Sequence, residues 1–263
     1  MDNRKDKLVS FDMDMTLLNH ADFKIPQSAL RAINRMRNHC YIVIATGRDL
    51  DASYSAGLAD PVRPDAIIHL NGNKITVGDE LIFEHCIDRD LVIRLLRFAE
   101  GKKFALGLTT GSEDYYVNPE YVVRQDEVRF GISERNFCDP WKLPDMPVRT
   151  MAYIGDERFV PEIEAAFPEL KLPLFSSRMG ADVIEKKASK AEGLKRLCAY
   201  YGLSLADTVA FGDSMNDIEI IRTAGIGVAM GNSVDALKEA ADYVTAPVGE
   251  DGVWKACEHL GLI

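Results

Sequence analysis

Short runs of apolar residues, each ending at a polar residue or glycine, dominate the pattern of this chain. Residues 8–11 end at Asp12, and residues 41–45 end at Thr46-Gly47-Arg48. Three later runs share this form: 66–70 before Asn71-Gly72, 208–211 before Gly212-Asp213, and 226–230 before Gly231-Asn232. The runs are β-branched or aliphatic and do not alternate with polar residues, which is typical of strands buried on both faces of a sheet.

Helical periodicity separates several of these runs. After Pro26, apolar residues recur at helical spacing, at Ala29, Leu30, Ile33 and Met36. The pattern also predicts helices over 191–200, 218–223 and 234–241, the last of them starting at Asn232-Ser233 with an acidic residue near its N-terminus. Strands that alternate with helices indicate βαβ units, so we expect an α/β fold with a Rossmann-like parallel sheet.

Residues 84–184 have a different pattern. It predicts a helix over 88–100 and another over 159–167, and it predicts a proline-rich loop over 136–147. Short strand-like runs lie between them, at 104–109, 115–117, 151–154, 172–175 and 182–184. Because the α/β rhythm resumes at Lys190, we interpret 84–184 as an inserted α+β domain and 1–83 with 185–263 as one catalytic core.

Composition narrows the functional classes. The chain has 263 residues, 47% of them hydrophobic, which is enough for a complete core. Its formal net charge of −10 disfavours nucleic acids and anionic membranes as partners, because both require a basic patch. The charge does not exclude an anionic substrate, since a metal ion and a few local cations can reverse the field of one pocket.

The ends and the cysteines point to an intracellular protein. Residues 1–7 are polar and lack the apolar centre of a signal peptide, and no apolar run approaches the ~18 residues of a membrane helix. The five cysteines are widely spaced, odd in number and without a CxxC pair, which disfavours disulfides and zinc sites. We therefore expect a cytoplasmic protein with reduced thiols.

Candidate chemistry lies where the predicted strands end. The carboxyl ends of parallel strands share one edge of a sheet, so Asp12, Asp14, Thr46 and Asp213 are expected to converge there. Three carboxylates in one crevice need compensating charge, and a set of oxygen ligands favours Mg²⁺. A metal-held carboxylate nucleophile, a second carboxyl group, a hydroxyl and a lysine form a plausible phosphoryl-transfer site. Alone, Asp12 and Asp14 would equally fit a solvated turn or a helix cap.

The ordered motifs resemble those of the haloacid dehalogenase superfamily. They are, in chain order, Asp12-x-Asp14-x-Thr16-Leu17, Thr46-Gly47-Arg48, Lys190-x-x-Gly193 and Gly212-Asp213-x-x-Asn216-Asp217. The insert between the second and third motifs is similar to the C2B cap of the Cof-like, type IIB phosphatases. The tail Asp251-Gly252-Val253 also resembles that subfamily.

The resemblance implies a role for each matching residue. Asp12 would be the nucleophile that becomes a phosphoaspartate, and Asp14 would be the general acid/base. Mg²⁺ would be held by the Asp12 carboxylate, the Asp14 backbone carbonyl and Asp213, and Asp217 would orient Lys190 or a metal-bound water. The groups expected to hold the phosphoryl oxygens are Thr46, Lys190, Asn216 and the backbone N–H groups of Met13 and Gly47.

One residue departs from the pattern of the family. Phosphatases of this kind commonly have Gly where this chain has Met15, and a backbone with φ > 0 there would cost Met about 1–2 kcal/mol. Three neighbouring residues stay open at this point: Arg48 fits either the site or an ion pair with a nearby carboxylate, His20 either the entrance or a surface position, and Asn71 either substrate contact or a turn.

The sequence therefore predicts a Mg²⁺-dependent phosphatase that hydrolyses small phosphorylated metabolites, with sugar phosphates as the expected class, and that is a monomer or weak homodimer. A phosphomutase of the same fold is an alternative, and product analysis would distinguish it. A non-catalytic phosphoryl-accepting or binding module is a second alternative. The position of Asp12 on the first strand, with Asp14 following it, favours turnover over a stored phosphoaspartate.

Overall fold

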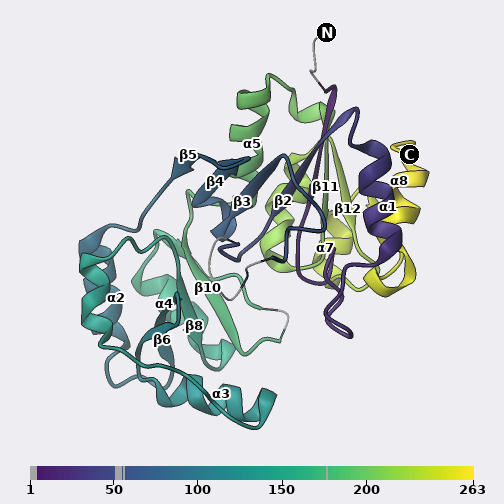
Figure 1. Cartoon of the computed structure of the whole chain (residues 1–263). Helices are drawn as coiled ribbons and strands as arrows, with labels where there is room; N and C mark the ends of the chain where they lie inside the picture. The colour runs from purple at the N-terminus through teal and green to yellow at the C-terminus, as the bar shows by residue number, and fades with distance from the viewer. Residues whose placement is uncertain (1–4, 51–54, 56, 176) are drawn as a thin grey trace. The chain divides into compact units, whose positions relative to one another are not determined.

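The chain divides into two compact units. The structure is a computed structural model that describes residues 5–50, 55, 57–175 and 177–263. The first unit comprises the chain up to Leu50 together with Gly57–Phe83 and Ala188–Ile263, and the second contains Glu84–Lys187 (Figure 1). The second unit is thus inserted into the sequence of the first.

An eight-stranded sheet forms the centre of the first unit in the described part of the chain, in the order β13-β12-β11-β1-β2-β3-β4-β5. The strands from β13 to β3 are parallel, and β4 runs antiparallel to β3. Their bounds are β1 Lys7–Phe11, β2 Cys40–Ala45, β3 Ala66–His69, β4 Lys74–Val77, β5 Glu80–Glu84, β11 Thr208–Gly212, β12 Ile226–Ala229 and β13 Tyr243–Val244. The parallel core confirms the α/β prediction.

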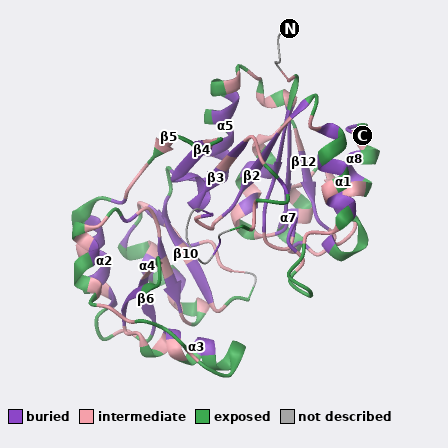
Figure 2. Cartoon of the chain, in the orientation of Figure 1, coloured by how far each residue is buried: buried purple, intermediate pink, exposed green. Residues whose placement is uncertain are grey.

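Helices cover both faces of this sheet because its strands are apolar on both sides. Val9 and Ile42 pack in one cluster with α1 (Gln27–Met36) and α8 (Gly252–His259). Leu8 and Val43, their neighbours in the chain, point to the opposite face and pack with α5 (Lys190–Tyr201), α6 (Ile218–Thr223) and α7 (Asp235–Ala240). The sheet is therefore the buried middle layer (Figure 2).

The second unit is built on an antiparallel sheet in the order β7-β6-β8-β10-β9. Its strands are β6 Ala105–Thr110, β7 Glu113–Val117, β8 Met151–Ile154, β9 Leu170–Lys171 and β10 Gly180–Glu185. Its helices α2 (Arg89–Ala99) and α4 (Val160–Ala166) pack into the larger apolar cluster, and Val122 of α3 (Glu120–Phe130) packs into a smaller one. Helices thus lie on both faces of this sheet as well.

Several details differ from the sequence-based expectations. The 136–147 loop contains a short 3₁₀ helix, Pro140–Asp145, started by the Asp139 carboxylate, which accepts a hydrogen bond from the amide of Trp141. The N-cap of helix α7 is Val234, which has no polar side chain to cap the helix, and the Ser233 hydroxyl donates to the Gly212 carbonyl at 3.2 Å. In the 172–175 run, Leu174 makes only an isolated bridge to Ala181.

All five cysteines are free thiols. Among the described residues, no helix has both the length and the apolar composition needed to cross a membrane.

Candidate active site

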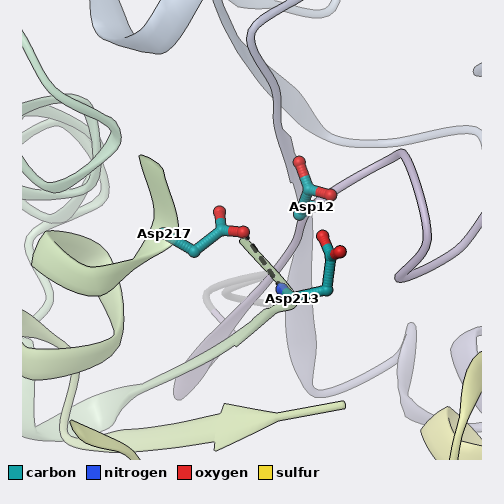
Figure 3. A group of neighbouring side chains, drawn as sticks. All are labelled: Asp12, Asp213 and Asp217. Carbon is teal, nitrogen blue, oxygen red and sulfur yellow. Dashed lines mark hydrogen bonds between the residues drawn. The ribbon is translucent and has the colours of Figure 1, made fainter. Parts of the chain in front are cut away.

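The ends of the central strands bring the predicted site residues together. Phe11 is in register with Phe211 of β11 and with Ile44 of β2, so these three strands end at the same level. Asp12 and Asp213 follow directly, and Thr46 follows β2. Oxygen atoms of Asp12, Asp213 and Asp217 lie within 4.8 Å of one another. Figure 3 shows these three side chains together.

Lys190 lies between two of these carboxylates, Asp12 and Asp217. Its Nζ donates hydrogen bonds to Oδ1 of Asp12 and to Oδ1 of Asp217, both at 2.6 Å, and its side chain is fully buried. Lys190 is the first residue of α5, whose N-cap Ser189 accepts a hydrogen bond from the amide of Glu192. The start of this helix therefore fixes where the ammonium group lies.

Asp217 uses both of its oxygens within the protein. Oδ1 accepts from Lys190, and Oδ2 accepts from the backbone amide of Ser214 at 3.1 Å. Oδ2 also accepts from the backbone amide of Asp213 at 3.0 Å, the bond drawn in Figure 3. By contrast, Oδ2 of Asp12 and the carboxylate of Asp213 take no hydrogen bond from the described part of the chain. This leaves Asp12 and Asp213 as the carboxylates available to a ligand, while Asp217 orients the lysine and the loop.

The site is short of positive charge. Burial raises the pKa of Asp12 above its ordinary value, despite the opposing effect of Lys190. Burial, together with the charges of Asp12 and Asp217, also raises the pKa of Asp213. Burial alone would lower the pKa of Lys190, but the two aspartates outweigh it and raise that pKa. One ammonium group thus cannot neutralise three buried carboxylates, and a divalent cation would complete the balance.

Asp14 lies in a different environment, about a third exposed at its side chain. Arg48 donates to both of its oxygens, from Nε at 2.6 Å and from Nη2 at 2.8 Å. Nε2 of His20 lies 2.7 Å from Oδ1 of the same carboxylate. Burial would raise the pKa of Asp14, but the hydrogen bonds and charge of Arg48, assisted by His20, hold it below its usual range. The environment therefore raises the pKa of Asp12 and lowers that of Asp14, two residues along the chain.

The remaining predicted residues surround this centre. The buried Thr46 hydroxyl accepts from the amide of Arg48 at 3.1 Å, so its own proton can be donated to a ligand. Nδ2 of Asn216 donates to Oδ1 of Asn71 at 3.0 Å, which links the loop after β11 to the loop after β3. Met13 is buried, and Gly47 is partly exposed beside Thr46.

Comparison with known protein families shows which family the chain belongs to. The model of a family described as haloacid dehalogenase-like hydrolase matches residues 9–257. The chain belongs to this family. Along its length this hydrolase is similar to the putative phosphatase YkrA of Bacillus subtilis, with 32% identity over 265 residues that cover 98% of each chain.

Solved structures of phosphatases match the hydrolase over nearly its whole length. BT1666 of Bacteroides thetaiotaomicron, a phosphatase of the same superfamily, has a TM-score of 0.89 and 28% identity, over 98% of this chain and 96% of its own. BT4131, described as a subclass IIB sugar phosphatase, has a TM-score of 0.87 and 30% identity, over 98% of this chain and 100% of its own. The hydrolase is thus a phosphomonoester hydrolase of the haloacid dehalogenase superfamily.

Met15, the departure noted in the sequence of this hydrolase, has a left-handed backbone. Its φ is 59°, its amide donates to the Leu18 carbonyl at 2.8 Å, and its carbonyl accepts from Nδ2 of Asn232 at 2.9 Å. These two hydrogen bonds fix a conformation that glycine adopts without strain and that other L-residues adopt at a cost. Packing of the Met15 side chain against the core cluster of α1 and α8 offsets part of that cost.

Glycine at position 15 is expected to give a more stable protein than alanine, although alanine is ordinarily the more stabilising residue of the two. Met15→Gly and Met15→Ala lose the same packing, but only Ala keeps the left-handed strain, so the Gly variant should have a free energy of unfolding higher by ~1 kcal/mol. Urea denaturation of the two variants measures this difference. An Ala variant at least as stable as the Gly variant would contradict the strain.

Gly72 allows the chain after β3 to lie close to the start of α5, the helix that begins at Lys190. Its φ is +96°, and a Cβ there would lie 2.2 Å from the carbonyl oxygen of Ser189, the N-cap of α5. The two preceding residues, Leu70 and Asn71, are also left-handed, with φ of 51° and 53°. Backbone strain at the end of β3 therefore accompanies the contact that positions Lys190 and Asn71.

Sequence reasoning left three of these residues undecided. Arg48 forms the ion pair with Asp14 that was one of its two alternatives. The contact between His20 and Asp14 had no sequence signal beyond proximity, because it depends on the path of the turn after residue 18. Asn71 had a signal in its position at the end of a buried strand, and it contacts Asn216.

Proposed function

We propose that this phosphatase hydrolyses small phosphomonoesters, with sugar phosphates as the substrate class, in a Mg²⁺-dependent reaction through a phosphoaspartate on Asp12. The observation that carries the proposal is the state of Asp12. One oxygen is held by Lys190 at 2.6 Å, and the other takes no hydrogen bond from the described residues. A fixed carboxylate with one free oxygen is suited to in-line attack on phosphorus.

In the first half-reaction, Oδ2 of Asp12 attacks the phosphorus atom, and the bond from phosphorus to the ester oxygen breaks. Asp14 gives a proton to the departing alcohol, and the anionic phosphoryl group bound beside Asp14 would favour the protonated form that this step needs. In the second half-reaction, Asp14 takes a proton from a water molecule as that water attacks the phosphorus of the phosphoaspartate. Inorganic phosphate leaves, and both carboxyl groups return to their starting states.

Asp12, Asp213 and the backbone carbonyl of Asp14 would hold the Mg²⁺. Their fit rests on the excess of buried carboxylates over cations and on the two carboxylates that the protein leaves unused. When bound, the ion supplies positive charge that stabilises the phosphoryl oxygens. Lys190, Thr46, Asn216 and the backbone N–H groups of Met13 and Gly47 would bind these oxygens beside it.

The inserted unit, residues 84–184, would act as a cap that excludes water and selects the leaving group. Its separate apolar clusters support an independently packed domain. The sugar phosphatase BT4131 supports the substrate class, because its chain is matched over its full length.

The test is a screen of phosphorylated metabolites with purified protein, in which released inorganic phosphate is measured. Hydrolysis of several sugar phosphates is expected with Mg²⁺. Excess EDTA should abolish it, and added Mg²⁺ should restore it. An isomeric sugar phosphate in place of inorganic phosphate would indicate a mutase, and full turnover in EDTA would contradict the metal requirement.

A further inference from the structure

A tight turn after the first motif carries two stacked rings beside Asp14. The turn spans residues 19–24 and is closed by a hydrogen bond from the Asn19 amide to the Lys24 carbonyl at 2.9 Å. Side chains inside the turn fix it further: Oδ1 of Asn19 accepts from the Ala21 amide, and Oδ1 of Asp22 accepts from the Lys24 amide. The turn is thus a defined structure.

Phe23 occupies this turn in a way that ordinary packing does not explain. Its side chain is 72% exposed, and its backbone is left-handed, with a φ of 53°. The left-handed conformation costs free energy for a bulky residue. The exposed ring offsets little of that cost, because stabilisation by an apolar side chain comes from the area that it removes from water. Its ring stacks on that of His20, with centroids 5.6 Å apart and planes inclined by 15°.

His20 in turn contacts Asp14. Its Nε2 lies 2.7 Å from Oδ1, so a hydrogen bond joins the imidazole to the carboxyl group of Asp14. Arg48, from the loop after β2, contacts the same carboxylate from a different segment of the chain. Two partners from separate segments restrict the rotation of a side chain more than one partner does.

We propose that His20 is a positioning residue for Asp14, and that Phe23 holds the imidazole in place by stacking. The inference rests on the proposed function, in which Asp14 protonates the leaving alcohol. An acid must lie within hydrogen-bond reach of the ester oxygen, and a displacement of ~1 Å can cost ~10²-fold in rate. Stored strain at Phe23 is consistent with a residue retained for this task.

The leaving group of the substrate provides the test. Alkyl phosphates need a proton on the departing oxygen, whereas p-nitrophenolate leaves without one. The value of kcat/KM reports the steps up to the first irreversible one, so it isolates the half-reaction in which Asp14 acts as an acid. His20→Ala is expected to lower kcat/KM about 10-fold for a sugar phosphate and less than about 2-fold for p-nitrophenyl phosphate.

Two variants of Phe23 complete the experiment. Phe23→Ala should act in the same direction as His20→Ala, with a smaller loss, and Phe23→Tyr should retain the activity because it keeps the stacked ring. Equal losses on both substrates, or no loss on either, would overturn the inference. The proposed function fails separately, if the unmodified protein releases phosphate from neither substrate, so the two failures are distinguishable.

Discussion

Asp12→Asn is expected to lower kcat by about 10⁴-fold or more, because it removes the only atom proposed to bond to phosphorus. The amide has the shape of the carboxylate and can still accept from Lys190, which remains paired with Asp217. Burial already disfavours the charged form of Asp12, so the free energy of unfolding should change by less than ~1 kcal/mol. The loss would therefore be one of chemistry and not of folding.

Two measurements check this prediction. Phosphate release is compared between the variant and the unmodified protein, with Asp79→Asn, an exposed aspartate of the same unit, as the matched control. Intact mass spectrometry after rapid mixing with substrate should detect one added phosphoryl group on the unmodified protein and none on the variant. Turnover by a variant whose asparagine is shown to be intact would exclude Asp12 as the nucleophile.

The parallel core and its edge could be predicted from the sequence because each physical cause is local. A strand buried on both faces reads as an uninterrupted apolar run, as in β1 and β2, and its end is marked by the first polar residue. The identity of Lys190 was predictable for a similar reason. Lys187 and Lys190 share one basic stretch, but a helix starts at Lys190, and burial of Lys190 and exposure of Lys187 follow from that start.

Other elements lacked such a local signal. The buried face of α3 includes Gln125 and Asp126 beside Val122, so apolar periodicity could not reveal the helix. Asp126 is buried because Arg135, nine residues along the chain, donates to both of its oxygens. The His20 contact depends in the same way on tertiary detail, a left-handed Phe23 that no pattern of apolar residues indicates.

Lys190→Met is expected to destabilise the protein by about 3 kcal/mol and to lower kcat/KM by about 10²–10³-fold. The side chain is fully buried between Asp12 and Asp217, and methionine has a similar volume without the charge. Removing one partner of a buried ion pair leaves the others without compensation, which costs more than the pair itself contributes. Urea denaturation should be run in EDTA, so that no divalent cation compensates for the lost ammonium group.

The two losses caused by Lys190→Met can be separated with a double variant. Lys190→Met with Asp217→Asn removes one of the two uncompensated carboxylates and is expected to recover about half of the lost stability. Activity should stay low, because the ammonium group that fixes Asp12 and binds the phosphoryl group is still absent. Lys195→Met, at an exposed lysine of the same helix that pairs with Glu192, should change stability by less than ~0.5 kcal/mol. Recovery of activity together with stability in the double variant would show that Lys190 acts through folding alone.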